Sequence, residues 1–188
     1  MGYWKRRSLL QLAALAVPSR IFTQVAPAAP AETVSTAPLH RDEDRYGPKR
    51  SIANGTSTFK VSSRDCRGEF FAMEHSHTSK GGPPRHLHHN EDEWFYVVEG
   101  TYLVEIGTTM HTLTAGDSVL GPRGISHAFA FNGENAGRLL ITYAPAGRME
   151  EYFDSRAKDA GGRTIYVNNA AKMAAFGMEL LGPPITTS

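Results

Sequence analysis

Short runs of apolar, β-branched and aromatic residues recur between residues 57 and 145, and turn residues separate them. The runs are STFKVSS, EFFAMEHSH, EWFYVV, TYLVEIG, HTLTAG, SVLGP, HAFAFNG and RLLITYAP. Turn-forming pairs such as Glu99-Gly100, Gly116-Asp117 and Asn132-Gly133 interrupt them. Many short strands at regular spacing are typical of an all-β sandwich or barrel. We therefore predict an all-β domain over residues 57–146.

The segments on either side of this domain have different patterns. Residues 32–56 are polar and broken by Pro and Gly, which predicts a linker or N-terminal arm. After the strands, GRMEEYFDSRAKD and NAAKMAAFGMELLG have the apolar spacing of short helices, and GPP ends the second. We therefore expect residues 147–188 to form a C-terminal helical extension that covers the sheet.

The first 31 residues have the features of an export signal. A basic start, MGYWKRRS, precedes the apolar stretch LLQLAALAV, and APAAPA offers cleavage sites after Ala28 or Ala31. The pair Arg6-Arg7 followed by SLL resembles a bacterial twin-arginine signal, although Lys5 and Leu9 differ from the usual residues. An ordinary secretory signal with a chance arginine pair is the alternative. Both alternatives predict a periplasmic or secreted protein.

Net charge, hydrophobic segments and cysteine content indicate which partners and crosslinks the chain can have. The 188-residue chain has a net charge of +1, and without residues 1–31 it carries 16 basic and 19 acidic residues, a net charge of −3. This balance argues against a nucleic-acid partner. No later segment is long enough to span a bilayer, so we expect no membrane partner after signal removal. Cys66 is the single cysteine, which excludes an internal disulfide.

Histidine and carboxylate side chains gather in RHLHHNEDEWFYVVEG. His86 and His88 are two residues apart, so on a strand they point to the same side. Glu93 begins an alternating strand, and His127 begins another. If these faces point into one barrel, three imidazoles and one carboxylate meet at one end of its interior. That set suits one divalent transition metal, with Fe, Mn, Ni, Co, Cu and Zn as candidates.

The spacing of these residues resembles the two motifs of the cupins. His86, His88, Glu93 and Gly100 match the first motif, although Lys80 replaces its leading Gly and Gly81 follows. Gly116, Pro122, Gly124 and His127 match the second motif, and Asn132 comes one residue late. The chain is similar to small single-domain, quercetin-dioxygenase-like cupins. The resemblance implies a double-stranded β-helix, or jelly-roll barrel, with a metal bound by His86, His88, Glu93 and His127.

Several neighbouring side chains have competing interpretations. Asp92 is the rival carboxylate ligand, but counting back from Gly100 selects Glu93, so Asp92 and Glu91 are expected to be solvated. His89 is expected to be exposed. His75 and His77 form a second His-x-His, for which we favour a polar outward face over a role near the mouth of the pocket.

Cupins perform many functions, so the resemblance does not select one. Our leading hypothesis is a metal-dependent oxygenase acting on a small organic molecule, with phenols as the candidate class. Glu93 would then also serve as the catalytic base. The alternatives are a non-catalytic binding or sensing module and a non-oxidative isomerase or decarboxylase. Because cupins are often dimers, a homodimer is the expected candidate assembly.

Overall fold

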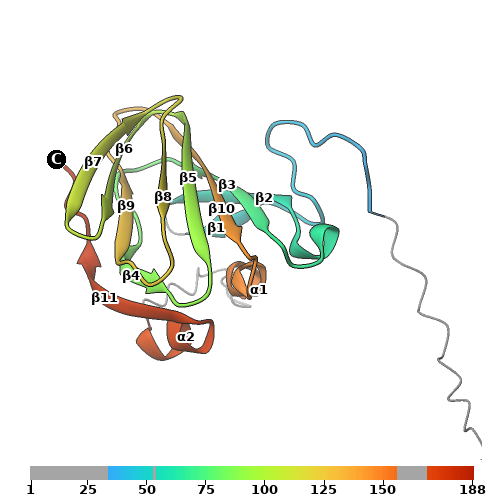
Figure 1. Cartoon of the computed structure of the whole chain (residues 1–188). Coiled ribbons are helices and arrows are strands. Elements are labelled where there is room, and N and C mark those ends of the chain that lie inside the picture. Colours follow the sequence, from blue (N-terminus) through green and yellow to red (C-terminus); the bar gives the residue numbers. More distant parts are fainter. Residues whose placement is uncertain (1–33, 53, 156–168) are drawn as a thin grey trace, which may run out of the picture. The chain divides into compact units, whose positions relative to one another are not determined.

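The structure is a computed structural model that describes residues 34–52, 54–155 and 169–188 (Figure 1). The described strands are β1 (Arg50–Ile52), β2 (Gly55–Val61), β3 (Phe71–His77), β4 (Pro84–His88), β5 (Asp92–Glu99), β6 (Thr101–Ile106), β7 (Thr109–Thr114), β8 (Ser118–Gly121), β9 (His127–Phe131), β10 (Gly137–Ala144) and β11 (Met178–Pro184). The described helices are the 3₁₀ helix η1 (Ser63–Cys66), α1 (Met149–Asp154) and α2 (Ala170–Ala175). All eight strands predicted from the apolar runs are confirmed.

The strands form two antiparallel sheets. One sheet has the order β1-β2-β3-β10-β5-β8, and the other has the order β11-β4-β9-β6-β7. Between β3 and β10 the chain passes repeatedly from one sheet to the other, so strands close in sequence face each other across the interior. This is the jelly-roll arrangement, and the predicted all-β fold class is confirmed.

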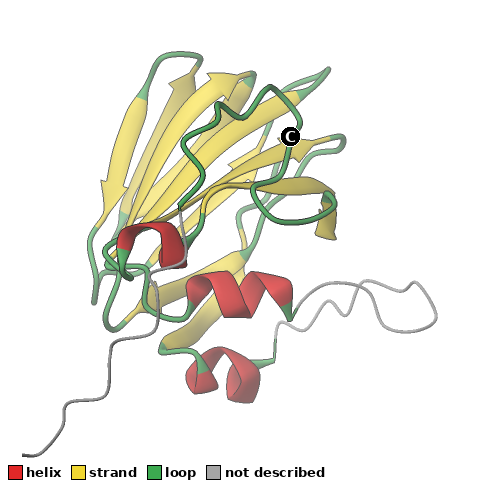
Figure 2. Ribbon diagram, turned by 90° about the vertical axis from the view of Figure 1, so that its right-hand side faces the viewer, coloured by secondary structure: helices red, strands yellow, loops and turns green. Residues whose placement is uncertain are grey.

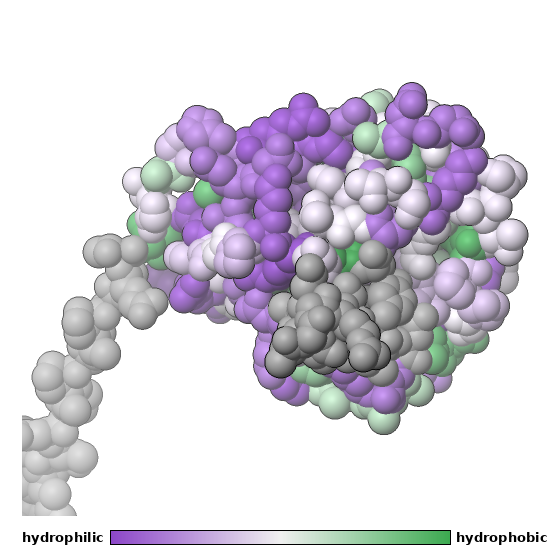
Figure 3. Space-filling view, turned by 180° about the vertical axis from the view of Figure 1, so that it is seen from behind, coloured by the Kyte–Doolittle hydropathy of each residue, from purple (hydrophilic) through white to green (hydrophobic). Residues whose placement is uncertain are grey.

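Alternation along the strands fills the interior between the sheets. On β5, Glu93, Phe95 and Val97 are buried, whereas Trp94 on the opposite face is exposed. The buried apolar side chains of both sheets form one main core cluster together with Met149, from α1. Hydrophilic residues cover much of the face seen in Figure 3, and apolar residues reach that face only in small areas. The polar and apolar alternation therefore separates the core from the outer surface.

The C-terminal segment differs from its predicted helical structure. Of the stretch NAAKMAAFGMELLG, residues Ala170–Ala175 are helical, but Met178–Pro184 form the edge strand β11 beside β4 (Figure 1). Gly177 ends the helix with a φ of +79°, a conformation that a side chain disfavours. Met178 then packs into the core and pairs with His88. Pairing with β4 therefore outweighs the helix preference of residues 178–181, MELL. Figure 2 shows the helices toward one end of the strands.

The N-terminal arm is also partly built into a sheet. β1 and the start of β2 lie within residues 32–56, which the sequence predicted to be a linker or arm. Before β1, the side chain of Asp44 accepts a hydrogen bond of 2.7 Å from the backbone of Phe59 and so ties the arm to β2. The predicted export signal, residues 1–31, lies outside the described residues. Among those described, no helix has the length and apolar character needed to cross a membrane.

Candidate metal centre

Four buried side chains meet at one place between the two sheets. Their ligand atoms, one each from His86, His88, Glu93 and His127, all lie within 4.8 Å of one another. The Oε2 atom of Glu93 is the meeting point. It lies 2.9 Å from Nε2 of His127, 3.1 Å from Nε2 of His88 and 3.8 Å from Nε2 of His86. The structure therefore brings together the whole predicted set, in a group able to hold one metal ion.

Strand pairing explains why these residues converge. β4 supplies His86 and His88 on its inward face, and His86 pairs directly with His127 of the neighbouring strand β9. Glu93 comes from β5 in the opposite sheet, where it pairs with Gly121 of β8. A Cβ atom on Gly121 would lie only 3.2 Å from Nδ1 of His127, so the absence of a side chain there leaves room for the imidazole. The site thus bridges the two sheets.

The loop before His127 is held to the same strands by polar contacts. Arg123 donates side-chain hydrogen bonds of 3.0 and 2.7 Å to the carboxylate of Asp92, at the start of β5. The Arg123 side chain and backbone donate to this carboxylate and lower the pKa of Asp92 to about 2. Gly124 donates a backbone hydrogen bond of 2.7 Å to the carbonyl of His88. These contacts fix the second motif beside the first.

Hydrogen bonds to backbone carbonyls set the tautomers of two imidazoles. Nδ1 of His86 lies 2.8 Å from the oxygen of Pro84, and Nδ1 of His127 lies 2.9 Å from the oxygen of Ile125. Because a carbonyl only accepts, each Nδ1 carries a proton, and Nε2 of each ring is directed toward Glu93. Nε2 of His127 lies 2.9 Å from Oε2 of Glu93, within hydrogen-bonding distance. This geometry fits a bound metal ion.

The surroundings of His88 also indicate a metal ion. Both of its ring nitrogens are buried and lack a hydrogen bond within the described part of the chain. Burial would lower the pKa of His88, but the carboxylates of Glu91 and Glu93 beside it raise that pKa to about 9. The pKa of His86 is instead lowered to about 3, chiefly by burial. A buried imidazole that lies beside carboxylates but forms no hydrogen bond of good geometry is the environment expected of a metal ligand.

Tyr143 completes the polar environment of Glu93. Its hydroxyl donates a hydrogen bond of 2.7 Å to Oε1 of Glu93, and the two residues pair directly between β10 and β5. Burial would raise the pKa of Glu93, but contacts with His127 and His88 hold it well below its ordinary value. Glu93 is therefore ionised, with Oε1 held by Tyr143 and Oε2 directed at the imidazoles. Sequence analysis did not anticipate this contact.

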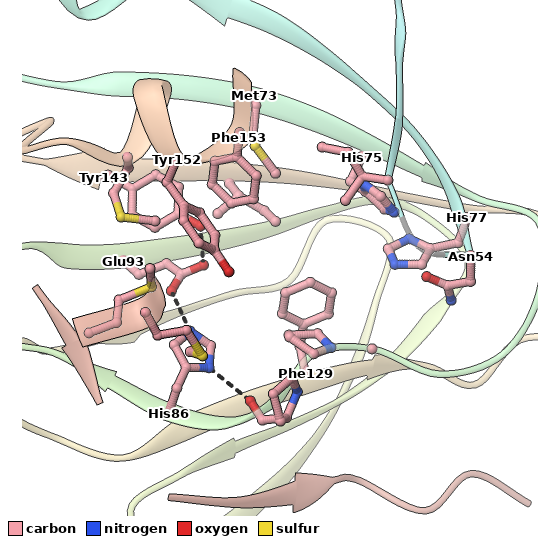
Figure 4. Close-up of a pocket in the computed structure, with 18 residues that line it drawn as sticks. Asn54, Met73, His75, His77, His86, Glu93, Phe129, Tyr143, Tyr152 and Phe153 are labelled. Carbon is pink, nitrogen blue, oxygen red and sulfur yellow. Dashed lines mark hydrogen bonds and ion pairs between the residues drawn. The ribbon is translucent and has the colours of Figure 1, made fainter. Parts of the chain in front are cut away.

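A cavity opens beside the site, and Figure 4 shows the residues that line it. Its volume is about 60 Å³, well above the roughly 10–15 Å³ that a cavity needs to hold one water molecule. His86 and Glu93 are at one end. Much of the wall is apolar and comes from both sheets and from the C-terminal segment, namely from Ile52, Met73, Phe129, Ile141, Met149, Tyr152, Phe153, Met173 and Met178. The metal-binding group therefore faces a small, largely apolar chamber.

Two expectations about neighbouring residues are wrong. Glu91 was expected to be solvated, but it is 2% exposed because it packs against Gly147 and lies 3.6 Å from Nδ1 of His88. His75 and His77 were expected to point outward, but they are 4% and 2% exposed and line the cavity.

Two other expectations agree with the structure. His89 is exposed, and Asp92 is partly exposed and paired with Arg123. Among the aromatic residues of the strands, Phe129 and Tyr143 line the cavity, whereas Phe71, Phe95 and Phe131 belong to the core alone. Sequence analysis missed the contributions of Tyr152 and Phe153 to the wall. Together with Met149, they had the apolar spacing of a helix face, which was the available signal.

Comparisons with known proteins agree with this fold. A family model described as a cupin domain matches residues 73–143. The structure of KdgF from Halomonas sp. is similar, with 16% identity and a TM-score of 0.50, over 59% of this chain and 94% of that one. The polyketide cyclase RemF from Streptomyces resistomycificus has 19% identity and a TM-score of 0.50, over 59% and 80% of the two chains.

None of the curated proteins compared with the chain matches its sequence. The two similar structures are less than 25% identical to this chain, so they bear on the fold alone. The family match, in contrast, covers β3 to β10 and all four residues of the metal-binding group. The chain therefore contains a cupin domain, at residues 73–143.

Proposed function

We propose that this chain is an exported, metal-dependent oxygenase that acts on a small phenolic molecule. The observation that carries the proposal is the position of the metal-binding group. His86 and Glu93 line a cavity whose walls are mostly apolar and aromatic, so a ligand in the cavity reaches the centre directly. Such a chamber, with few convergent polar groups, is typical of a small-molecule site.

His86, His88, Glu93 and His127 would hold the metal. Three nitrogen ligands and one carboxylate suit Fe and Mn, and they also accept Ni, Co, Cu or Zn. When bound, the metal would supply Lewis acidity and a route for electrons between the organic molecule and dioxygen. Four protein ligands would leave one or two positions for small molecules on a metal that accepts five or six ligands, and His86 and Glu93 line the cavity from which a ligand would approach.

Glu93 is the residue proposed to move a proton. It is ionised, and among the described residues that line the cavity it is the single carboxylate. Its lowered pKa makes it a weak base, which suits a phenol whose own acidity rises when its oxygen binds a cation. The hydrogen bond from Tyr143 keeps Oε1 oriented while the proton is accepted. Met149 and Phe153, two buried apolar side chains from α1, also line the cavity.

The size of the cavity narrows the class of molecule. A chamber of about 60 Å³ admits at most a single ring, since the engineered apolar cavity that binds benzene has about 150 Å³. A three-ring flavonol exceeds this space. We therefore favour single-ring phenols over flavonols as substrates.

A non-oxidative isomerase or decarboxylase is the second candidate. One observation favours it: His75 and His77 lie in the cavity, so imidazoles are present besides those in the metal-binding group. Burial, followed by the nearby His75, lowers the pKa of His77 to about 2, which makes His77 a poor base. This property weighs against the second candidate.

Oxygen uptake tests the proposal. Metal-free protein would be loaded separately with Fe(II), Mn(II), Ni(II), Co(II), Cu(II) and Zn(II), and oxygen consumption recorded with single-ring phenols and with a flavonol. We expect uptake with a redox-active metal and a single-ring phenol, and none with Zn(II). Substrate conversion without oxygen uptake would favour the non-oxidative enzyme. Tight phenol binding without conversion under any metal would favour a binding module.

A further inference from the structure

A second group of polar side chains lies in the cavity, away from the metal-binding group. Figure 4 shows His75, His77 and Asn54 together on one side, with Glu93 and His86 on the other. His75 and His77 come from β3, and Asn54 immediately precedes β2, whose first residue pairs with His77. We name His77 and Asn54 the distal pair. Burying a polar group costs free energy unless the group forms a hydrogen bond. The hydrogen bonds available to the distal pair therefore indicate what the cavity can bind.

The hydroxyl of Tyr102 fixes the tautomer of His77. The two groups are 2.9 Å apart, between the phenolic oxygen and Nδ1. Among the described residues, Nδ1 is the single hydrogen-bond partner of this buried hydroxyl, and burial raises the pKa of Tyr102, which keeps its proton in place. Accepting from His77 would leave the phenolic proton buried without an acceptor, so Tyr102 donates. Nδ1 of His77 is then an acceptor, and Nε2 carries the proton.

His77 therefore presents a hydrogen-bond donor that the protein itself does not use. No residue in the described ranges accepts a hydrogen bond from Nε2, although the side chain is 2% exposed and lines the cavity. The ring is held from several sides, edge-on to His75 at 4.2 Å and to Phe129 at 5.9 Å. Its pKa of about 2, lowered first by burial, keeps it neutral. A fixed, neutral donor remains available to a ligand.

Asn54 supplies the complementary acceptor. Its Nδ2 donates hydrogen bonds of 2.7 and 3.2 Å to the backbone oxygens of Ser79 and Gly81. Because carbonyls only accept, these bonds assign the amide nitrogen and leave Oδ1 as the remaining polar atom. The side chain lines the cavity beside His77 (Figure 4). Together, the distal pair offers one donor and one acceptor.

We propose that the distal pair binds a neutral hydroxyl group on a single-ring ligand whose other oxygen reaches the metal. A hydroxyl both accepts and donates, so it can satisfy His77 and Asn54 together. No Lys or Arg is among the described residues that line the cavity, so a carboxylate or phosphate at this end would have no counter-charge. Phe129, which packs against His77, provides an apolar surface for the ring. The inference rests on the metal centre of the proposed function and deepens it by naming the substrate class.

Binding without turnover tests the inference. Zn(II)-loaded protein under anaerobic conditions would be titrated by calorimetry with catechol, pyrogallol and benzene-1,2,4-triol. These probes share the metal-binding catechol and differ in a third hydroxyl. We expect at least one triol to bind on the order of tenfold more tightly than catechol, as one or two net hydrogen bonds allow. Equal affinities for all three probes, or no binding of any, would overturn the proposal.

Substitutions at His77 test whether the distal pair causes the preference for a triol over catechol. His77→Phe should bring the triol-to-catechol ratio close to one and leave the Zn(II) content unchanged. His77→Gln retains an amide donor and should keep part of the preference, and it carries the test if His77→Phe does not fold. His89→Phe is the matched control, because His89 is exposed and directly follows β4, and it should keep the full preference. A preference that survives unchanged in His77→Phe would contradict the assignment.

Oxygen uptake with the redox-active metals distinguishes a failure of the distal-pair proposal from a failure of the proposed oxygenase function. Turnover without any preference for a third hydroxyl would retain the oxygenase and reject the distal pair. A preference that His77→Phe abolishes, in a protein that never consumes oxygen, would retain the distal pair and reject the oxygenase.

Discussion

The hydroxyl of Tyr143 donates a hydrogen bond of 2.7 Å to Oε1 of Glu93, across the pairing of β10 with β5. Because both side chains are buried, this bond fixes which carboxylate oxygen faces the three imidazoles. Such partners of metal ligands orient the ligand and maintain its charge. Tyr143 is therefore a positioning residue for the metal centre.

Tyr143→Phe should weaken metal binding without removing a ligand. We expect the affinity for Zn(II) to fall by about 10- to 100-fold, the usual effect of losing such a partner. Competition with a chromophoric chelator would measure it. Tyr96→Phe is the control, because Tyr96 lies on the outer face of the same strand as Glu93. Equal affinities in wild type and Tyr143→Phe would show that Glu93 is oriented without Tyr143.

The buried, neutral His77 should make folding stability depend on pH. Its pKa is about 2 in the folded chain, lowered first by burial and then by His75, against about 6.5 when unfolded. Below pH 6.5 the unfolded chain takes up a proton that the folded chain refuses. The stability from this group is therefore complete above pH 6.5 and is lost as the pH falls, with a slope approaching about 1.4 kcal/mol per pH unit.

Urea unfolding of metal-free protein at pH 6.5, 5.5 and 4.5 measures this slope. His77→Phe should show a shallower loss of the free energy of unfolding than wild type, and exposed His89→Phe should match wild type. Parallel slopes for wild type and His77→Phe would mean that His77 is protonated in the folded chain. They would also weaken the tautomer assigned through Tyr102.

Glu93→Gln should separate the two roles proposed for Glu93. The amide oxygen is a weaker, neutral ligand, so metal binding weakens, but loading at high metal concentration can restore occupancy. Gln has no basic oxygen, so turnover at full occupancy should fall by on the order of a hundred- to ten-thousandfold. Oxygen consumption with matched metal content provides the measurement. An unchanged rate would keep the enzyme and remove Glu93 as its base.

Export can be tested independently of the metal centre. KRRSLLQLAALAV predicts a mature N-terminus near residues 29–32, and changing both Arg6 and Arg7 to Lys should block translocation if the twin-arginine route is used. Cell fractionation and N-terminal sequencing would show both effects. Continued export of the double variant would favour the general secretory route.

Local sequence patterns predicted much of the fold and the metal-binding group. The strands alternate with period two, and each of the four site residues lies at the start or on the inward face of such a strand. The spacing from His86 to Gly100 also selected Glu93 over Asp92. These features depend on neighbours in sequence, so they are readable before any tertiary structure is known.

The missed features depend on contacts between distant segments. Tyr143 reaches Glu93 through a strand register that joins residues 50 apart, which no local pattern fixes. β11 is a strand because it pairs with β4, against the preference of its residues. The inward direction of His77 had a local signal, because Phe71 and Met73 precede it at period two on one face. Sequence analysis instead predicted an outward face for His75 and His77 because both side chains are polar, and that prediction was wrong.

Metal content per chain tests the central claim most directly. Wild-type protein, stripped of metal and reconstituted with a divalent ion, should contain about one ion per chain by elemental analysis. His86→Ala, His88→Ala and His127→Ala should each lose most of it at the same free metal concentration, whereas His89→Ala should retain it. Circular dichroism would confirm that each variant remains folded. Full metal content in all three ligand variants, or none in the wild type, would contradict the metal centre.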